Sequence, residues 1–267
     1  MVLNPSPFDF ENRVKAISQG ASGDQFVIEA QSYLKIMGFP LGNFGPNHNG
    51  IDGQFGETAR AAMQTFQILS EQELTSTLNV GILIEMEKSA TNGSTFRSLA
   101  KYAYQQGIQL PISSQSNPGQ FVNTVYYYSV LDEMNTKVPA AVTTAQAILE
   151  TGFGKKVTTD INSNRYSYNL FGIKGTGPTG SVISWDQEQD PKTGIWQPVR
   201  ASFRSYNNFG ESIKDHSQFF HENSRYQAAF QTNTPAAFAR TIAKAGYATD
   251  PNYAEKLLYI ISYWGLT

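Results

Sequence analysis

Apolar residues recur at helical spacing in the first third of the chain. One buried helix face is predicted by four residues at three- and four-residue steps, namely Val27, Ala30, Leu34 and Met37. Gly38 then supplies the left-handed residue that commonly ends a helix. After a loop rich in Gly and Asn, a second helix is predicted with Thr58 as its cap and a buried face of Ala59, Ala62, Met63 and Phe66. With a third helix over about 79–88, residues 24–88 are predicted to form a three-helix bundle that follows an N-terminal extension, 1–23.

The pattern changes over residues 89–119, where clusters of Pro, Gly and Ser predict a linker with one short helical stretch between Phe96 and Gly107. Residues 120–267 predict a second domain. It begins with two helices separated at Val138 and Pro139, and it ends with helices between Phe209 and Trp264. Between them, polar residues alternate with Val, Ile, Trp and Phe over about 181–206, which predicts a β-hairpin. The expected fold class is mainly α, with a β insertion in the second domain.

The charge content of the chain narrows the classes of ligand. Charged residues make up 16%, below the roughly 25% of ordinary soluble domains, and neutral hydrogen-bonding residues replace them. Such a surface suits a neutral, hydroxyl-rich ligand. The net charge of -2 gives no counterion-release drive toward nucleic acid, so no nucleic-acid partner is expected. The absence of Cys excludes disulfides and thiol nucleophiles, and neither a secretory signal nor a membrane span is expected.

Glu150 is the first candidate for chemistry. It follows the apolar face formed by Ala145, Ile148 and Leu149 and stands in the last helical turn before Gly152. The negative end of the helix dipole and the unsatisfied carbonyls there disfavour ionisation, and apolar neighbours such as Phe153 and Phe171 would raise the pKa further. This is the setting of a general acid. From spacing alone, a glutamate at a frayed helix end is the alternative.

Five segments in order, AQAILETGFG, NLFGIKG, ASFRSYNNFGESIKDH, RY and AGYATDPNYAEKL, resemble the glucosaminidase domain of glycoside hydrolase family 73. That family contains bacterial and phage peptidoglycan hydrolases. Separately, AQSYLKIMGF together with IDGQFGETARAAMQTFQ resembles a small helical peptidoglycan-binding domain. The two resemblances cover most of residues 25–267. They imply a wall-binding bundle followed by a lysozyme-like α+β catalytic domain with a small β-hairpin lobe.

The resemblance also implies roles for individual residues. Glu150 matches the general acid that protonates the glycosidic oxygen. The second carboxylate of the family corresponds to Glu188, with Asp186 and Asp190 as rivals, and Tyr247 matches a tyrosine near the scissile bond. Substrate contacts are expected from Asn169, Phe171, Phe153, Tyr206 and Tyr253, where Phe153 replaces the Trp usual in the family. Asp250, before Pro251, is expected to cap a helix.

Wall stems are expected to bind near the turn that contains Asp52, Gly53 and Phe55. The histidines, His48, His216 and His221, are expected to be solvated or structural, so neither a metal nor a cofactor is predicted. The expected partners are peptidoglycan glycan strands and stem peptides, and the protein is expected to be a monomer.

The predicted activity is hydrolysis of the β-1,4 bond between N-acetylglucosamine and N-acetylmuramic acid by an endo-β-N-acetylglucosaminidase anchored to the wall. The alternatives are a muramidase or lytic transglycosylase, and a non-catalytic wall-binding or virion protein. The expected site of action is the bacterial wall or periplasm, reached by phage-type release, by dedicated secretion or as a processed mature form.

Overall fold

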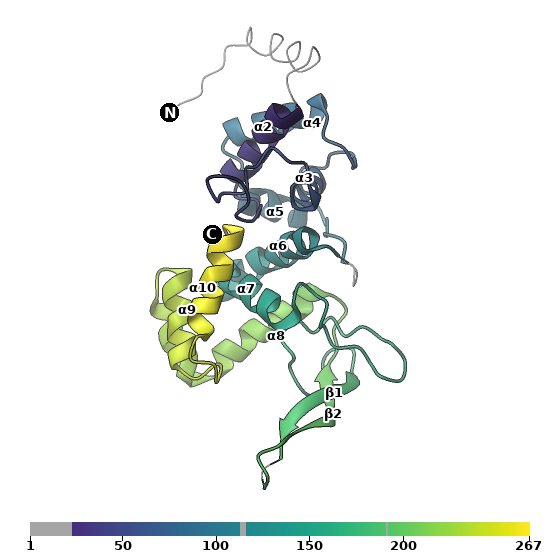
Figure 1. The fold of residues 1–267 in the computed structure, drawn as a ribbon, viewed down its shortest axis with the longest axis vertical. Coiled ribbons are helices and arrows are strands. Elements are labelled where there is room, and N and C mark those ends of the chain that lie inside the picture. The colour runs from purple at the N-terminus through teal and green to yellow at the C-terminus, as the bar shows by residue number, and fades with distance from the viewer. Residues whose placement is uncertain (1–22, 113–115, 191) are drawn as a thin grey trace. The chain divides into compact units, whose positions relative to one another are not determined.

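The computed structural model describes residues 23–112, 116–190 and 192–267 (Figure 1). The expected N-terminal extension therefore lies outside the described residues, except for its last residue. The chain divides into two compact units. The first holds the described residues up to Gln109 with Ser262–Leu266, and the second holds Leu110–Ile261 with Thr267. Within the described residues, no helix is both long enough and apolar enough to cross a membrane.

The first unit contains the three predicted helices: α2 (Gly23–Ile36), α3 (Glu57–Leu69) and α4 (Val80–Thr91). The predicted apolar faces of α2 and α3 are buried. Gly38 has a φ of +82°, which confirms the predicted end of the first helix. The predicted cap of α3 is wrong: Gly56 is the N-cap and makes no side-chain cap bond, while Thr58 already lies inside the helix.

A fourth helix, α5 (Phe96–Gln105), joins this unit. Its start is fixed by a capping box between Thr95 and Ser98, and Phe96 packs edge-on against Phe39 with ring centroids 5.0 Å apart. The first part of the stretch predicted as a linker, residues 89–119, is thus a packed element of the unit. The predicted helical stretch between Phe96 and Gly107 is confirmed. Its packing into the unit was not expected, because only Phe96, Ala100 and Ala103 of this helix are buried.

The second unit begins with two helices around one core. α6 (Pro118–Thr136) is capped by Asn117, and Lys137 then turns the chain with a φ of +64°. α7 (Ala140–Thr151) follows with Pro139 as its N-cap. Residues 140–148 of α7 are all buried, so this helix runs through the interior of the unit.

The remaining described elements of the second unit are two strands and four further helices. They are the strands β1 (Ser181–Gln189) and β2 (Trp196–Arg204), then α8 (Phe209–Glu222), the 3₁₀ helix η1 (Ser224–Gln231), α9 (Pro235–Lys244) and α10 (Tyr253–Trp264). One core cluster joins Val142 of α7 with Phe220 of α8, Ile242 of α9 and Leu257 of α10.

The two strands form the predicted antiparallel hairpin, which projects from the helices of its unit (Figure 1). Asp186 pairs with Val199 and Glu188 pairs with Gln197. Because strand residues alternate between faces, Val182, Asp186 and Glu188 share one face of the hairpin. The base of this face is buried, at Val182, Ala201 and Phe203, and its outer part carries the two carboxylates. The hairpin therefore aligns Asp186 and Glu188 on the face that continues from its core.

Candidate active site

Glu150 stands at the C-terminal end of the buried helix α7. The helix stops directly after it because Gly152 adopts a left-handed conformation (φ +54°) and donates its N–H to the Ile148 carbonyl at 2.9 Å. Thr151 fastens the same turn: its hydroxyl donates to Ala147 O at 2.6 Å and accepts the Gly154 N–H at 2.9 Å. The carboxyl is therefore carried by a hydrogen-bonded helix end, and the residue keeps part of its surface in contact with solvent.

The surroundings of Glu150 favour its neutral form. Nearby protein atoms remove part of the water around the carboxyl, and this burial raises its pKa above the usual value of a glutamate. The unsatisfied carbonyls at the helix end oppose a negative charge as well. At any given pH, Glu150 thus carries its proton more often than an ordinary glutamate does, which is the property that a general acid needs.

Two tyrosines accompany Glu150. The rings of Tyr247 and Tyr253 stack with centroids 5.5 Å apart, and Gln146 Nε2 donates to the Tyr253 hydroxyl at 2.8 Å. Gln146 precedes Glu150 by four residues on α7, so both lie on one helix face. Burial raises the pKa of Tyr247 well above its ordinary value, and Tyr253 and the charge of Glu150 add to this effect. The Tyr247 phenol therefore keeps its hydrogen and can donate it.

Tyr247 also contacts a histidine of α8. His216 Nε2 lies 3.0 Å from the Tyr247 hydroxyl, and the imidazole stacks on Phe171 with centroids 3.8 Å apart at an interplanar angle of 12°. Phe171, which was expected to contact substrate, is half-buried. The fold therefore brings together Glu150, Tyr247, Tyr253 and Phe171 from separate segments. Gln146 binds Tyr253, and His216 contacts both Tyr247 and Phe171.

The hairpin carboxylates form a second group. Lys174 Nζ lies 2.6 Å from Glu188 Oε1 and 2.7 Å from Asp186 Oδ2, so one ammonium joins both candidates for the second carboxylate. The hydrogen bond from Lys174 holds the pKa of Asp186 below its usual range. Across the described residues, no hydrogen bond or ion pair connects Glu188 with Glu150, Tyr247 or Tyr253.

Asp190 differs from the other two hairpin acids. It accepts the backbone N–H groups of Lys192 and Thr193 at 2.8 and 2.9 Å. These bonds keep its pKa below the usual value. Asp190 therefore shapes the turn of the hairpin, which leaves Glu188 and Asp186 as the two candidates.

Three residues that were expected to bind substrate, Asn169, Tyr206 and Tyr253, are buried in contacts within the fold. Asn169 is only 2% exposed, and its amide is saturated by the backbone: Nδ2 donates to Ile173 O and Arg204 O, while Oδ1 accepts from Phe171 N and Ile173 N. It holds its own loop together and has no free group for an N-acetyl substituent. The sequence could not show this, because Arg204 is 35 residues away.

Tyr206 is also 2% exposed, and its hydroxyl donates to Asp215 Oδ2 at 2.6 Å. The same carboxylate binds Arg204 NH1 through both of its oxygens, at 2.7 and 2.8 Å. Tyr206 is therefore the buried member of a partly exposed junction between β2 and α8. Tyr253, at 3% exposure, is likewise buried and supports Tyr247 by stacking on it instead of offering a free ring.

Phe153 and Asp250 occupy turns near the acid. Phe153 is half-buried in a left-handed conformation (φ +62°), with its ring 6.4 Å from Phe121. Asp250 accepts the Asn252 N–H at 2.9 Å and binds Lys256 at 2.6 Å. It was expected to cap a helix, but it closes the turn before α10, which begins only at Tyr253. In the part of the chain that the structure describes, no three His, Asp or Glu side chains are grouped to hold a metal ion.

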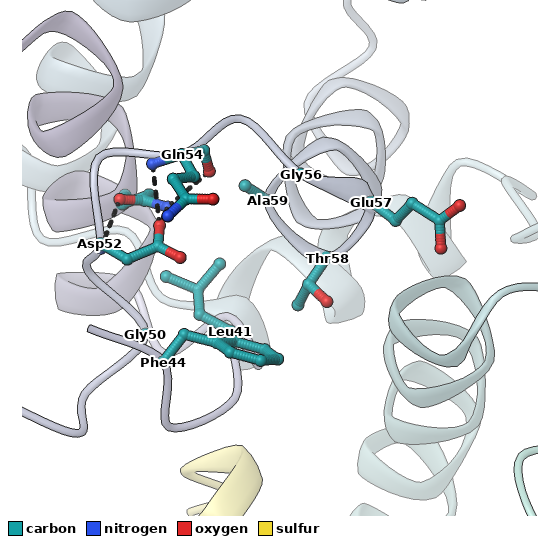
Figure 2. A pocket seen from close by; sticks show the side chains of 10 residues that line it. Leu41, Phe44, Gly50, Asp52, Gln54, Gly56, Glu57, Thr58 and Ala59 are labelled. Carbon is teal, nitrogen blue, oxygen red and sulfur yellow. Dashed lines mark hydrogen bonds between the residues drawn. The ribbon is translucent and has the colours of Figure 1, made fainter. Parts of the chain in front are cut away.

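The first unit carries a separate pocket of about 220 Å³ (Figure 2). Gln31 of α2, Leu41, Phe44 and Asp52 of the loop, and the first turn of α3 line it. Gln31 fixes the loop, because its Nε2 donates to Asp52 Oδ1 at 2.7 Å and its Oε1 accepts the N–H of Asp52 and of Gly53. Gly53 needs its φ of +73° to make this turn.

Phe55 is not part of the pocket lining, and the guanidinium of Arg60 lies over its ring at 5.3 Å. Of the three expected wall-binding residues, the structure thus places Asp52 in the pocket, Gly53 in its supporting turn and Phe55 outside it.

Sequence reasoning missed three supporting residues, namely Gln146, His216 and Lys174. Gln146 carried a usable signal, since it lies one helical turn before Glu150. Lys174 stands within the NLFGIKG segment, but its partners lie 12 and 14 residues further on in the hairpin. His216 was expected to be solvated or structural. It is buried, and nothing local in the sequence links it to Tyr247.

A helical body, a small β-hairpin and a carboxyl of raised pKa at a helix end beside tyrosines define a lysozyme-like glycoside hydrolase domain. The family model named glucosaminidase, described as mannosyl-glycoprotein endo-beta-N-acetylglucosaminidase, matches residues 129–266. The chain belongs to this family, which corresponds to the glycoside hydrolase family 73 resemblance.

Individual relatives agree with this placement. The chain is 37% identical over 147 residues to the peptidoglycan hydrolase FlgJ of Vibrio parahaemolyticus serotype O3:K6, which covers 54% of this chain and 46% of that protein. It is 33% identical over 132 residues to the exo-glucosaminidase LytG of Bacillus subtilis, covering 47% and 44%. The chain thus spans less than half the length of these curated relatives.

Among solved structures, the catalytic domain of the autolysin Auto from Listeria monocytogenes matches with a TM-score of 0.50 and 25% identity, over 62% of this chain and 93% of that one.

Proposed function

We propose that this chain is a peptidoglycan hydrolase, an endo-β-N-acetylglucosaminidase that cleaves the β-1,4 bond between N-acetylglucosamine and N-acetylmuramic acid. The observation that carries the proposal is Glu150, a carboxyl of raised pKa on a hydrogen-bonded helix end beside two tyrosines, in a glucosaminidase-family domain. The proposed site of action is the bacterial wall or the periplasm, where this substrate lies.

In the proposed reaction, Glu150 gives its proton to the glycosidic oxygen as the bond to the anomeric carbon breaks. The opposite side of the sugar then requires a base for water, a carboxylate nucleophile or the 2-acetamido group of the substrate itself. We assign the carboxylate role to Glu188. It matches the second carboxylate of the family, and it shares a strand face and the Lys174 ammonium with Asp186.

Tyr247 supplies a hydrogen-bond donor beside the acid. Its raised pKa keeps the phenol protonated, so it can bind an acceptor oxygen of the substrate, such as the acetamido carbonyl. Phe171 remains half-exposed beside it and offers an apolar surface for a sugar ring.

The first unit is proposed to hold the wall through its pocket. Asp52 and Glu57 line the pocket and no Lys or Arg does, so a cationic or amide-rich segment of a stem peptide fits its charge. Asp52 is already fixed by Gln31, which lowers the ordering cost of binding.

Glu150→Gln tests the catalytic assignment, because it removes the transferable proton and keeps the shape. The variant should fail to lyse purified walls and should still sediment with them. Glu255→Gln is the matched control, since among the described residues this exposed glutamate of α10 forms its ion pair with Arg240 at the surface. Lysis by Glu150→Gln at the rate of the parent would exclude Glu150 as the acid.

The bond that is cut can be read from the products. Mass spectrometry of digested peptidoglycan should show new reducing ends on N-acetylglucosamine. Reducing muramic acid ends would make the chain a muramidase, and anhydromuramyl ends would make it a lytic transglycosylase. Large fragments formed early in digestion would indicate endo cleavage, whereas release of single disaccharides from chain ends would indicate exo cleavage.

A further inference from the structure

His216 is the most enclosed titratable group near the proposed site. Its side chain is 1% exposed and lies among three rings: Phe171 stacks on one face, while Phe220 and Tyr247 meet it edge-on. All of these neighbours are uncharged, and burial lowers the pKa of His216 to about 3. The imidazole is therefore neutral at neutral pH and carries one N–H hydrogen.

The position of that hydrogen follows from the hydrogen bonds. Nε2 lies 3.0 Å from the Tyr247 hydroxyl, whereas Nδ1 is buried and has no partner among the described residues. With the hydrogen on Nδ1, a buried donor would be left unsatisfied. With the hydrogen on Nε2, only an acceptor lone pair is left unsatisfied, which proteins tolerate more readily. The Nε2–H tautomer is thus the favoured one, and Nε2 donates to the phenol.

This assignment decides what Tyr247 can do. A phenol oxygen that accepts from His216 must direct its own hydrogen elsewhere. The Tyr247 hydroxyl makes no other hydrogen bond within the described part of the chain, so that hydrogen has no acceptor among these residues. Stacking on Phe171 prevents the imidazole from turning away, because rotation would break the 3.8 Å contact.

We propose that His216 is a positioning residue that donates Nε2–H to Tyr247 and so directs the Tyr247 hydroxyl hydrogen toward an acceptor oxygen of the bound glycan beside Glu150. The acceptor with the matching chemistry is the carbonyl oxygen of a 2-acetamido group. This inference rests on the proposed function, because it requires a glycan at Glu150.

The tautomer can be measured without turnover. Long-range ¹H–¹⁵N correlation spectra of the ¹⁵N-labelled full chain resolve the two ring nitrogens of each of its three histidines. His216 is assigned by the signals that disappear in His216→Gln. A neutral Nε2–H imidazole throughout pH 5–8 is expected. A neutral Nδ1–H imidazole, or a ring that becomes charged in this range, would overturn the proposal.

A double-mutant cycle tests the route through Tyr247. His216→Leu removes the donor and should lower kcat about tenfold with KM changed less than about twofold, whereas His216→Gln keeps an N–H donor and should recover most of the loss. In the Tyr247→Phe background, His216→Leu should have almost no further effect on kcat. Losses that multiply across the two backgrounds would show that His216 does not act through the phenol.

His221→Gln is the control on the same helix. Its ring binds Thr136 O at the surface, so kcat should stay at the level of the parent. If His216→Leu does not fold, the tautomer spectra still decide the matter. A wild-type chain without activity on peptidoglycan would count against the proposed function. An Nδ1–H tautomer in an active chain would overturn only the role of His216.

Discussion

Lys174 Nζ lies 2.6 Å from Glu188 Oε1, and the same ammonium reaches Asp186. Exposed ion pairs of this kind contribute little to stability, about 0–1 kcal/mol. Strand alternation already places both carboxylates on one face of the hairpin, and the shared lysine pairs with both of them there.

Glu188→Gln and Asp186→Asn form a matched pair of variants that shows which residue is the second catalytic carboxylate. Glu188→Gln should lower kcat by roughly 10²-fold, the scale for loss of a catalytic acid or base, whereas Asp186→Asn should lower it by less than about threefold. Steady-state rates on purified peptidoglycan measure both. The reverse order would assign the second carboxylate to Asp186, and small effects in both would favour catalysis assisted by the substrate's own acetamido group.

The raised pKa of Glu150 predicts a pH dependence of activity. A general acid must be protonated, so kcat/KM should fall as pH rises through that raised pKa. The fall in kcat/KM should therefore occur at a higher pH than it would for an ordinary glutamate. In Glu150→Gln, the residual rate should not show this fall with rising pH. A pH–rate profile of both proteins checks this prediction. If the variant shows the same fall in rate at high pH, that fall belongs to another group.

The same pKa predicts an effect on stability. Because burial raises the folded-state pKa of Glu150, its contribution is fully present below the unfolded-state pKa and is lost as pH rises through the folded-state pKa. Glu150→Gln should thus have a slightly higher Tm than the parent at neutral pH, and the gap should close in acid. Thermal melts at several pH values measure this, and a lower Tm at neutral pH would contradict it.

Asn169→Ala should reveal a structural role. The substitution leaves the carbonyls of Ile173 and Arg204 and the N–H groups of Phe171 and Ile173 without their amide partner. A loss of about 2–4 kcal/mol of unfolding free energy is expected, since each unsatisfied buried group costs about 1–3 kcal/mol. Urea unfolding measures the loss. A stable variant with a selectively raised KM would instead restore Asn169 as a substrate contact.

Asp52→Asn tests the pocket of the first unit. Asparagine keeps the oxygen that accepts from Gln31 and Gln54 but removes the charge, so the turn should persist. In the Glu150→Gln background, where walls stay intact, Asp52→Asn should weaken sedimentation with peptidoglycan about tenfold, the scale of one charged hydrogen bond. Phe55→Ala, outside the pocket lining, should bind nearly as the parent does.

Local pattern predicted most of the architecture. The faces of α2 and α3, the break at Val138 and Pro139, and the hairpin over 181–206 all follow from apolar periodicity and turn residues, which are properties of neighbouring positions. The helical stretch expected between Phe96 and Gly107 is α5, but the local pattern did not show that this helix packs into the first unit. The local prediction was wrong at Thr58, because Gly56 is the cap of α3. The placement of Glu150 succeeded because a helix end is itself a local feature.

What the sequence alone determined is the set of helices, the hairpin and the position of Glu150 at the end of its helix, since backbone preference and 3.6-residue periodicity act within a few residues. Only the tertiary structure decided which polar groups are free. In the folded chain, the Asn169 amide is fully hydrogen-bonded and the buried Tyr206 donates to Asp215. Lys174 pairs with two carboxylates, and His216 lies beside Tyr247, 31 residues away. These outcomes depend on hydrogen-bond partners that lie on different elements, and a buried polar group takes whichever partner the packing brings to it.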